Sequence, residues 1–246
     1  MKWLHDLGAY IILMRQVFRR PENDRIYLRQ ILIEMERLGL DSLPIVAIIS
    51  VFMGAVLCIQ LAFNIEHPLV PLYTIGLSVR ESVVLEFSPT IISLILAGKI
   101  GSRIASEIGT MRVTEQIDAL EIMGINPAAY LIFPKIVACV VINPFIIVVS
   151  MFLALLGGWA AGVTTGLVSS SVFIYGLQSF FIPFNIVYAL IKTMVFAFLI
   201  SSISGFYGFT TRGGALEVGA ASTKGVVQSS IMIIVFNLIL TQLLLT

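Results

Sequence analysis

The stretch LPIVAIISVFMGAVLCIQLAF, residues Leu43–Phe63, contains 21 residues without a single charge. A helix needs roughly 20 mostly apolar residues to cross the hydrocarbon core of a bilayer. The rest of the chain has the same character, because 58% of its 246 residues are hydrophobic and 12% are charged. Soluble domains carry about 25% charged residues. A soluble fold of this size would leave too much apolar surface in water, so the composition indicates an integral membrane protein.

Two further segments are equally clear candidates for membrane spans. Ile136–Leu156 and Val226–Leu245 are uncharged and long enough to cross a bilayer. Asn143-Pro144 lies inside the first of them and is expected to kink it, with neighbouring helices satisfying the freed backbone groups.

Two other candidates contain charges. Ile186–Phe206 is long enough but includes Lys192, and only 12 uncharged residues separate Glu86 from Lys99, too few to cross alone. With both included, the sequence predicts an all-α membrane protein of five transmembrane helices. An odd number of spans places the two termini on opposite sides of the membrane.

The distribution of lysine and arginine predicts the orientation, since cytoplasmic loops are enriched in both. Residues 1–41 hold seven, the second-to-third connection holds four and the fourth-to-fifth connection holds two, whereas residues 157–185 carry no charge. The N-terminus is therefore expected in the cytoplasm and the C-terminus outside.

The N-terminal residues 1–41 form a region separate from the five-span domain, residues 42–246. Two amphipathic helical stripes, broken by Pro21-Glu22-Asn23-Asp24, predict helices lying on the cytoplasmic leaflet. The alternative is a helical pair packed on the protein's own cytoplasmic face. The region lacks the basic, apolar and small-residue succession of a cleavable signal peptide, so none is expected.

Several ionisable side chains lie at or near membrane depth, where each costs about 2.5–3.5 kcal/mol and is seldom accidental. Glu86 and Lys192 are candidates for a functional role, although Lys192 can instead extend to the outer interface. Lys99, Arg103 and Glu107 share one helical face, and Arg103 and Glu107 are spaced to pair. That face is either the wall of a polar cavity or subunit contact, or a solvated cytoplasmic helix end.

The connection Thr110–Gly124 predicts a short helix between the second and third spans. Thr114 can cap it, and Glu115 and Asp118 suit its positive N-terminal end. Its final glycine can end it, and Asn126-Pro127 prevents continuation. Its apolar stripe consists of Val113, Ile117, Leu120 and Met123. Such a helix either offers an apolar surface to a soluble partner or is an ordinary amphipathic loop helix.

Other functional classes find little support. The net charge of +1 does not suit nucleic acid. Cys58 and Cys139 lie in apolar runs, and His5 and His67 are far apart, so neither a disulfide framework nor a metal site is expected. No phosphate-binding glycine loop and no nucleophile–base pair is present, so an enzyme is not expected. Glycines at 157, 158, 162 and 166 are instead spaced for close helix approach.

Two longer blocks resemble a known family. AGKIGSRIASEIGTMRVTEQIDALEIMGINP (Ala97–Pro127) is similar to the signature of the MlaE/YrbE-type permeases of MCE lipid-transport ABC systems. GFTTRGGALEVGAASTKGVVQSS (Gly208–Ser230) resembles the family's second block, which precedes the last span. The likeness extends over nearly all of the chain from about Leu40, and the five-span layout agrees with it.

The resemblance implies a permease homodimer in the bacterial inner membrane, bound to two copies of a separate ATPase. ATP and Mg²⁺ would bind that ATPase, and this chain would need no cofactor. A periplasmic MCE-domain lipid-binding protein would complete the system, and some systems add a small cytoplasmic STAS-domain subunit. The implied cargo is phospholipid or another hydrophobic lipid, moved between the inner and outer membranes.

The resemblance also implies site residues. The family's ATPase contact falls on the helix that matches this set: Thr110, Met111, Arg112, Thr114, Glu115, Gln116, Ile117, Asp118, Leu120, Met123 and Gly124. The family's lipid cavity lies between the first, second and fifth spans, near Gln60, Glu86 and Lys192. Leu57, Leu61 and Val227 would form its apolar wall, or serve as ordinary packing residues.

The chain departs from the family pattern at two positions. Relatives often have arginine where this chain has Leu85, and some have aspartate where it has Asn237. We hypothesise that a paired interaction was lost at both positions together. Rival interpretations of the chain are an ion-coupled secondary transporter using Glu86 and Lys192, for which no inverted repeat is evident, and a membrane scaffold that transports nothing.

Overall fold

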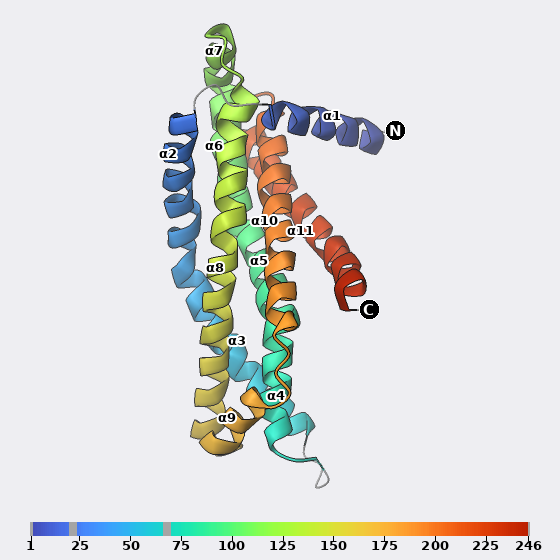
Figure 1. Cartoon of the computed structure of the whole chain (residues 1–246). Helices are drawn as coiled ribbons and strands as arrows, with labels where there is room; N and C mark the ends of the chain where they lie inside the picture. Colours follow the sequence, from blue (N-terminus) through green and yellow to red (C-terminus); the bar gives the residue numbers. More distant parts are fainter. Residues whose placement is uncertain (1, 20–23, 66–69, 246) are drawn as a thin grey trace. The chain divides into compact units, whose positions relative to one another are not determined.

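The computed structural model describes residues 2–19, 24–65 and 70–245, and all regular secondary structure within them is helical (Figure 1). The α-helices are α1 (Lys2–Val17), α2 (Asp24–Glu34), α3 (Leu43–Asn64), α4 (Tyr73–Ser82), α5 (Ile92–Leu96), α6 (Ser102–Val113), α7 (Gln116–Ile122), α8 (Pro127–Thr164), α9 (Ser170–Gln178), α10 (Phe184–Phe209) and α11 (Ala215–Leu245). Short π-helical or 3₁₀ segments join several of these: η1 (Met35–Gly39), η2 (Leu40–Ser42), η3 (Val83–Ile91) and η4 (Ala97–Gly101).

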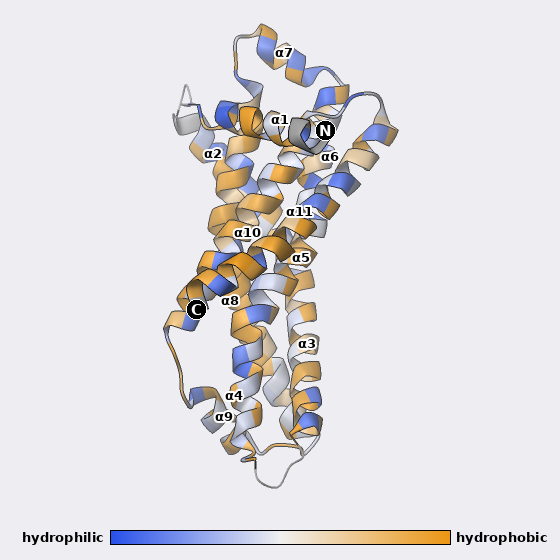
Figure 2. Ribbon diagram, turned by 90° about the vertical axis from the view of Figure 1, so that its right-hand side faces the viewer, coloured by the Kyte–Doolittle hydropathy of each residue, from blue (hydrophilic) through white to orange (hydrophobic). Residues whose placement is uncertain are grey.

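Five helices in the described part of the chain are long and apolar enough to cross a membrane, which confirms the predicted number. They are Tyr27–Asn64, Tyr73–Val113, Pro127–Thr164, Phe184–Phe209 and Ala215–Leu244. Apolar residues predominate along α10 and α11, whereas α7 mixes polar and apolar residues (Figure 2). The protein is therefore a multi-pass membrane protein.

The second span is longer than its uncharged core of 12 residues suggests. The helix runs for 41 residues, Tyr73–Val113, through both η3 and η4. Charged side chains interrupt a hydropathy pattern, but they leave the backbone hydrogen bonds of a helix intact. The same continuity joins α2 to α3 in one helix, Tyr27–Asn64. A membrane-surface location for α1 and α2 stays a prediction.

Two packing units divide the chain. Unit 1 comprises residues 1–42, 93–143 and 194–246, and unit 2 comprises residues 43–92 and 144–193. Long helices contribute to both, so the predicted division into residues 1–41 and 42–246 describes the order along the chain rather than these packing units. In α8 the helix continues through Pro144, and the adjacent Asn143 is fully buried.

Unit 2 is held together by close contacts between α3 and α8. A Cβ atom on Gly54 or Gly157 would overlap the backbone of the other helix, so these positions admit no side chain. A buried chain of hydroxyls links the same helices to η3, with Ser50 donating to Ser150 at 2.8 Å and Ser150 to Ser88 at 3.2 Å. The predicted close helix approach is thus found at Gly157.

Unit 1 brings α6 against the end of α10 and the start of α11. A Cβ atom on Gly208 would lie 2.8 Å from the carbonyl oxygen of Ala105, and one on Gly109 would lie 3.3 Å from Val218. Ser222 adds a hydrogen bond of 3.2 Å to the carbonyl oxygen of Ser102. Small side chains therefore let the three segments pack backbone to backbone.

Candidate functional site

The two candidate charges of the second and fourth spans form an ion pair in unit 2. The Lys192 ammonium is 2.9 Å from Glu86 Oε1, and the Lys192 side chain is fully buried, while that of Glu86 is 48% exposed. Lys192 also donates to the hydroxyl of Tyr188 at 2.8 Å and to the carbonyl oxygen of Leu85 at 3.2 Å. The hydroxyl of Thr90 donates to the other Glu86 oxygen at 3.1 Å.

Local helix geometry positions both partners. Glu86 lies in the π-helical segment η3, which contains Pro89, and such segments are frequent at functional sites because they re-aim side chains. Tyr188 lies one turn before Lys192 on α10, so the spacing of four residues places its hydroxyl beside the ammonium. The tyrosine ring also lies under the charge, with 4.7 Å between Lys192 Nζ and the ring centroid.

The pairing revises the sequence interpretation of these charges. The alternative in which Lys192 extends to the outer interface is wrong, because its ammonium is bonded inside unit 2. Neither Glu86 nor Lys192 has an adjacent charged residue along the sequence, but the two neutralise each other across 106 positions. The sequence did contain a signal for this pair. Two opposite charges occur at membrane depth, where an unpaired charge costs free energy.

The remaining predicted lipid-contacting residues belong to two helices, α3 and α11. On α3, Gln60 is exposed and Leu57 and Leu61 are half-buried, all in unit 2. Val227 belongs to unit 1, on α11, and is 53% exposed. Leu85 contributes its backbone carbonyl to Lys192, so the contact does not depend on the identity of the side chain at position 85. The lipid role of all six residues stays a prediction.

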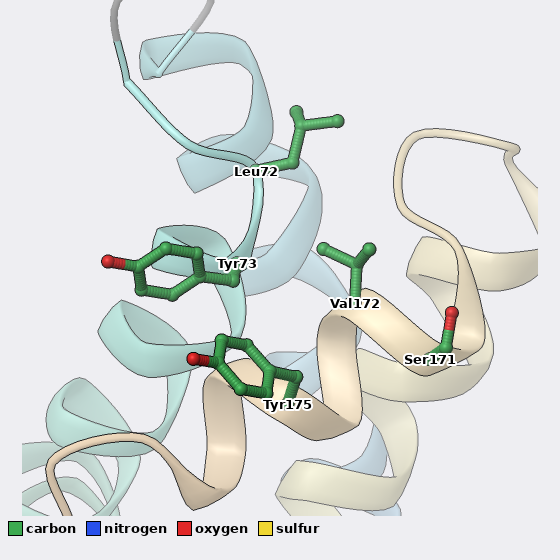
Figure 3. A pocket seen from close by; sticks show the side chains of 5 residues that line it. All are labelled: Leu72, Tyr73, Ser171, Val172 and Tyr175. Carbon is green, nitrogen blue, oxygen red and sulfur yellow. The ribbon is translucent and has the colours of Figure 1, made fainter.

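Two cavities lie elsewhere in the described structure. One of about 390 Å³ is lined in unit 2 by Leu72, Tyr73, Ser171, Val172 and Tyr175 (Figure 3). The other, about 470 Å³, lies in unit 1 between α1, α10 and α11, and Tyr10 and Phe206 are among its lining residues. Burial raises the pKa of the Tyr10 hydroxyl, which donates to Ser202 at 2.9 Å. Neither cavity includes any of the six predicted lipid contacts.

A short helix between the second and third spans is present as α7, but it starts differently from the prediction. Thr114 ends α6, with its hydroxyl donating to the carbonyl oxygen of Thr110 at 2.9 Å. Glu115 follows with a left-handed backbone, φ 61°, and makes no side-chain cap to α7. The prediction that Thr114 caps the N-terminus of α7 is therefore wrong, because Thr114 instead ends α6.

The end of α7 agrees with the prediction. Gly124 has φ +79°, its N–H donates to Glu121 O at 2.9 Å, and the Ile125 N–H donates to Leu120 O at 3.0 Å. Together these bonds form the Schellman motif that commonly ends a helix at glycine. Asn126 and Pro127 then lead into α8.

The apolar stripe of α7 divides into a buried and an exposed part. Ile117 is fully buried, whereas Ile122 is 88% and Met123 63% exposed. Packing within unit 1 thus uses Ile117, and the exposed apolar surface of α7 centres on Ile122, which lies outside the predicted stripe. The other predicted ATPase contacts, Thr110, Met111, Arg112, Thr114, Glu115, Gln116, Asp118, Leu120 and Gly124, are half-buried or exposed. Their role as contacts stays a prediction.

The charges near α6 form partnerships that spacing alone did not reveal. Arg103 pairs with Asp41 at 2.9 Å, and Glu107 pairs with Lys135 at 2.8 Å. The expected pair of Arg103 with Glu107 is wrong. The continuation of α2 supplies the partner of Arg103, and α8 supplies the partner of Glu107. Lys135 is 4% exposed and also binds Glu34 at 2.6 Å. The helix continues through Lys99, Arg103 and Glu107 as far as Val113, so these residues do not lie at a helix end.

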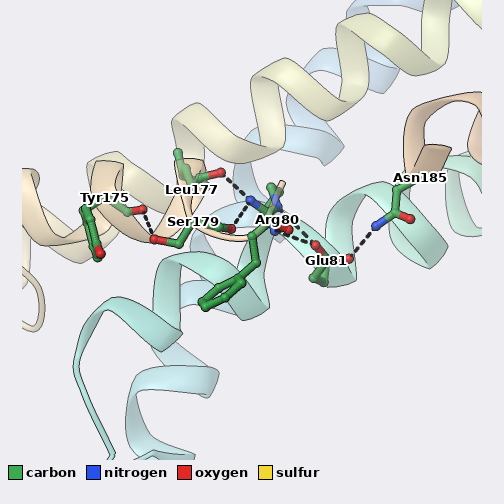
Figure 4. Close-up of polar contacts among 7 residues, drawn as sticks. Arg80, Glu81, Tyr175, Leu177, Ser179 and Asn185 are labelled. Carbon is green, nitrogen blue, oxygen red and sulfur yellow. Dashed lines mark hydrogen bonds and ion pairs between the residues drawn. The ribbon is translucent and has the colours of Figure 1, made fainter. Parts of the chain in front are cut away.

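Arg80 is a structural residue that charge and hydropathy patterns along the sequence do not single out. Its guanidinium is buried and donates to the carbonyl oxygens of Leu177, at 2.5 Å, and Ser179, at 2.8 Å (Figure 4). It also pairs with Glu81 at 2.6 Å, and Glu81 accepts a 2.9 Å bond from Asn185. This network fastens the α9–α10 connection to α4.

Comparisons with known proteins agree over nearly the whole chain. The family model described as permease MlaE matches residues 31–243. A probable ABC transporter permease protein of Rickettsia felis is 34% identical over 99% of this chain and 93% of its own length. A second from Synechocystis sp. is 34% identical over 98% of this chain and 92% of its own length.

A plant protein is also similar. The chloroplastic protein TRIGALACTOSYLDIACYLGLYCEROL 1 of Arabidopsis thaliana is 34% identical over 94% of this chain and 66% of its own length. The family match, the bacterial relatives and the five long apolar helices all describe one kind of molecule, the membrane-spanning subunit of a transporter. The chain belongs to the MlaE permease family.

Proposed function

We propose that this protein is the permease subunit of an ATP-driven transporter that moves phospholipid between the inner and outer membranes of a bacterium. It acts as a homodimer in the inner membrane, with its N-terminus in the cytoplasm and its C-terminus in the periplasm. ATP and Mg²⁺ bind a separate ATPase, and a periplasmic MCE-domain protein exchanges lipid with the permease. A STAS-domain subunit is a further candidate partner.

The observation that carries the proposal is the match to permease MlaE over residues 31–243. The Arabidopsis relative supports a lipid cargo, since a galactolipid is part of its name. The half-exposed carboxylate of Glu86, held by a buried lysine, supplies a fixed polar group among apolar helices. Such a group can orient the polar end of a lipid while apolar side chains accommodate its acyl chains.

The ATPase contact is assigned to α7. This helix ends in two exposed apolar side chains, Ile122 and Met123, next to a buried anchor, Ile117. An exposed apolar tip on a short, well-anchored helix fits a groove on a soluble partner. Movement of the ATPase would displace α7 and change the arrangement of the spans, with nucleotide biasing two discrete states.

The decisive experiment is purification of the tagged protein in lipid nanodiscs from its native membrane, followed by mass spectrometry of bound proteins and lipids. We expect an ATPase, an MCE-domain protein and phospholipid. Reconstituted vesicles should then transfer fluorescent phospholipid to the MCE-domain protein only with hydrolysable ATP. Purification of the protein alone, without an ATPase, would overturn the proposal and favour a scaffold.

A second candidate function is ion-coupled secondary transport, favoured by the Glu86–Lys192 pair at membrane depth. It requires the carboxylate to exchange a proton or cation during transport. The same vesicles distinguish the two functions, because an ion gradient without ATP would then drive lipid transfer. The charge-neutral Glu86→Gln variant should abolish gradient-driven transfer while an ATP-driven system retains its dependence on ATP.

A further inference from the structure

Arg112 contacts two different elements from the last turn of α6. Its Nη1 atom is 2.6 Å from Asp118 Oδ1, in the first turn of α7. The centre of its guanidinium lies 5.9 Å from the ring centroid of Phe209, the last residue of α10. All three residues belong to unit 1, at the end where α7 follows α6 (Figure 1).

The turn between α6 and α7 is short. Only Thr114 and Glu115 separate the two helices, and Glu115 adopts a left-handed backbone. The ion pair to Asp118 spans this corner and holds α7 against the end of α6. Without it, the orientation of α7 would depend on the turn and on the buried side chain of Ile117.

The contact of Arg112 with Phe209 connects α6 to the end of α10 rather than to α7. Phe209 precedes the connection to α11, and α6 is already packed against this region, since Gly109 faces both Thr211 and Val218. The guanidinium is therefore located where α6, α7 and the end of α10 meet. Its side chain is 30% exposed, so both contacts are only partly screened by solvent.

We propose that Arg112 is a positioning residue that transmits a displacement of α7 to the α10–α11 connection, and thereby to the last two spans. The inference rests on the proposed function, in which an ATPase displaces α7. Arginine suits the role because the edge of its planar guanidinium binds a carboxylate while its face lies on an aromatic ring. A lysine could pair with Asp118 but could not also stack on Phe209.

Two spin labels test the physical link without any ATPase. Glu121→Cys on α7 and Leu216→Cys at the start of α11 are exposed positions, and the native Cys58 and Cys139 are buried. In the otherwise unchanged protein, diluted with an excess of unlabelled protein so that each homodimer carries at most one labelled protomer, pulsed dipolar spectroscopy should give one narrow distance distribution. Arg112→Lys should broaden it, and Arg112→Ala should broaden it further.

The matched control is Arg103→Lys. Arg103 lies on the same helix and also forms an ion pair, but its partner is Asp41. This control should leave the distance distribution unchanged. An equally narrow distribution in Arg112→Ala, or equal broadening in the Arg103→Lys control, would overturn the inference.

The second measurement is the number of lipids transferred per ATP hydrolysed in vesicles containing the permease, its ATPase and the MCE-domain protein. In Arg112→Lys we expect the number of lipids transferred per ATP hydrolysed to fall roughly threefold to tenfold, whatever the rate of ATP hydrolysis, as expected for one or two weakened surface contacts. An unchanged ratio in an active complex would overturn the role of Arg112 and leave the proposed function standing. Failure of the wild-type protein to engage an ATPase would overturn both.

Discussion

Replacing Glu86 by glutamine should destabilise the protein more than replacing Glu86 and Lys192 together. The amide keeps the shape of the carboxylate but removes its charge and replaces one acceptor oxygen by a donor NH₂ group. The Lys192 ammonium, which is fully buried, then loses its carboxylate partner while the neutral oxygens of Tyr188 and Leu85 remain bonded to it. A buried charge without a counter-ion is the costly state, and the double variant Glu86→Gln/Lys192→Met removes it.

The magnitude follows from the exposure of the two partners. Removing one member of a fully buried ion pair costs about 3–5 kcal/mol. Glu86 is 48% exposed, so its charge is partly screened, and we expect Glu86→Gln to lower the free energy of unfolding by about 2 kcal/mol. Lys192→Met leaves a half-exposed carboxylate that still accepts a bond from Thr90, at a cost of about 1 kcal/mol.

The free energy of unfolding of the double variant should lie within about 1 kcal/mol of that of the unmodified protein, so the two substitutions combine with a coupling energy near 2 kcal/mol. Reversible unfolding in mixed micelles, followed by tryptophan fluorescence, gives all four free energies. Gln60→Leu, at an exposed position on α3, serves as the control and should change stability by less than about 0.5 kcal/mol. Equal stability of Glu86→Gln and the unmodified protein, or strictly additive effects, would refute the reasoning.

Three further predictions concern packing, the α7 surface and the α9–α10 connection. Gly54→Val should lower the thermal midpoint strongly because the side chain would overlap the backbone of α8, whereas Gly219→Ala, in open space on α11, should be neutral or stabilise by up to about 1 kcal/mol; equal midpoints would contradict this. Ile117→Glu should prevent folding because the Ile117 side chain is 0% exposed, whereas the Ile122 side chain is 88% exposed and Ile122→Glu should fold. The folded Ile122→Glu variant should lose ATPase binding in a pull-down. Full binding would contradict the assignment of the ATPase contact to α7. Arg80→Met should expose the α9–α10 connection to faster amide hydrogen exchange, because several carbonyl oxygens lose their donor; unchanged exchange would show that other contacts hold it.

The length and hydropathy of the spans, and the residues that end a helix, could be read from the sequence. Five spans could be counted because crossing a bilayer requires a minimum length of apolar helix, and that length is a property of consecutive residues. The end of α7 at Gly124 was predictable for the same reason, since the left-handed backbone that a helix terminus needs is local and glycine adopts it without strain. The family signature, too, is a run of adjacent residues.

Partnership between distant residues was decided only by the tertiary structure. Lys192 and Glu86 are 106 positions apart, and nothing in their separate surroundings specifies which helices lie side by side. The same applies to Glu107, which pairs with Lys135 on α8 rather than with Arg103 on its own helix. Burial of an ion in an apolar medium requires a nearby counter-charge, so the need for a partner is evident from the sequence, while its identity depends on helix packing.

Exposure on the short helix α7 depended on packing in the same way. A stripe at helical spacing indicates which residues share a face, but not whether the fold itself or a partner covers that face. Packing in unit 1 covers Ile117 and leaves Ile122 exposed. The sequence by itself thus determined the membrane class, the five spans and the family. The tertiary structure decided which charges neutralise one another and which apolar side chains remain for a partner, because both depend on neighbours that are distant along the chain.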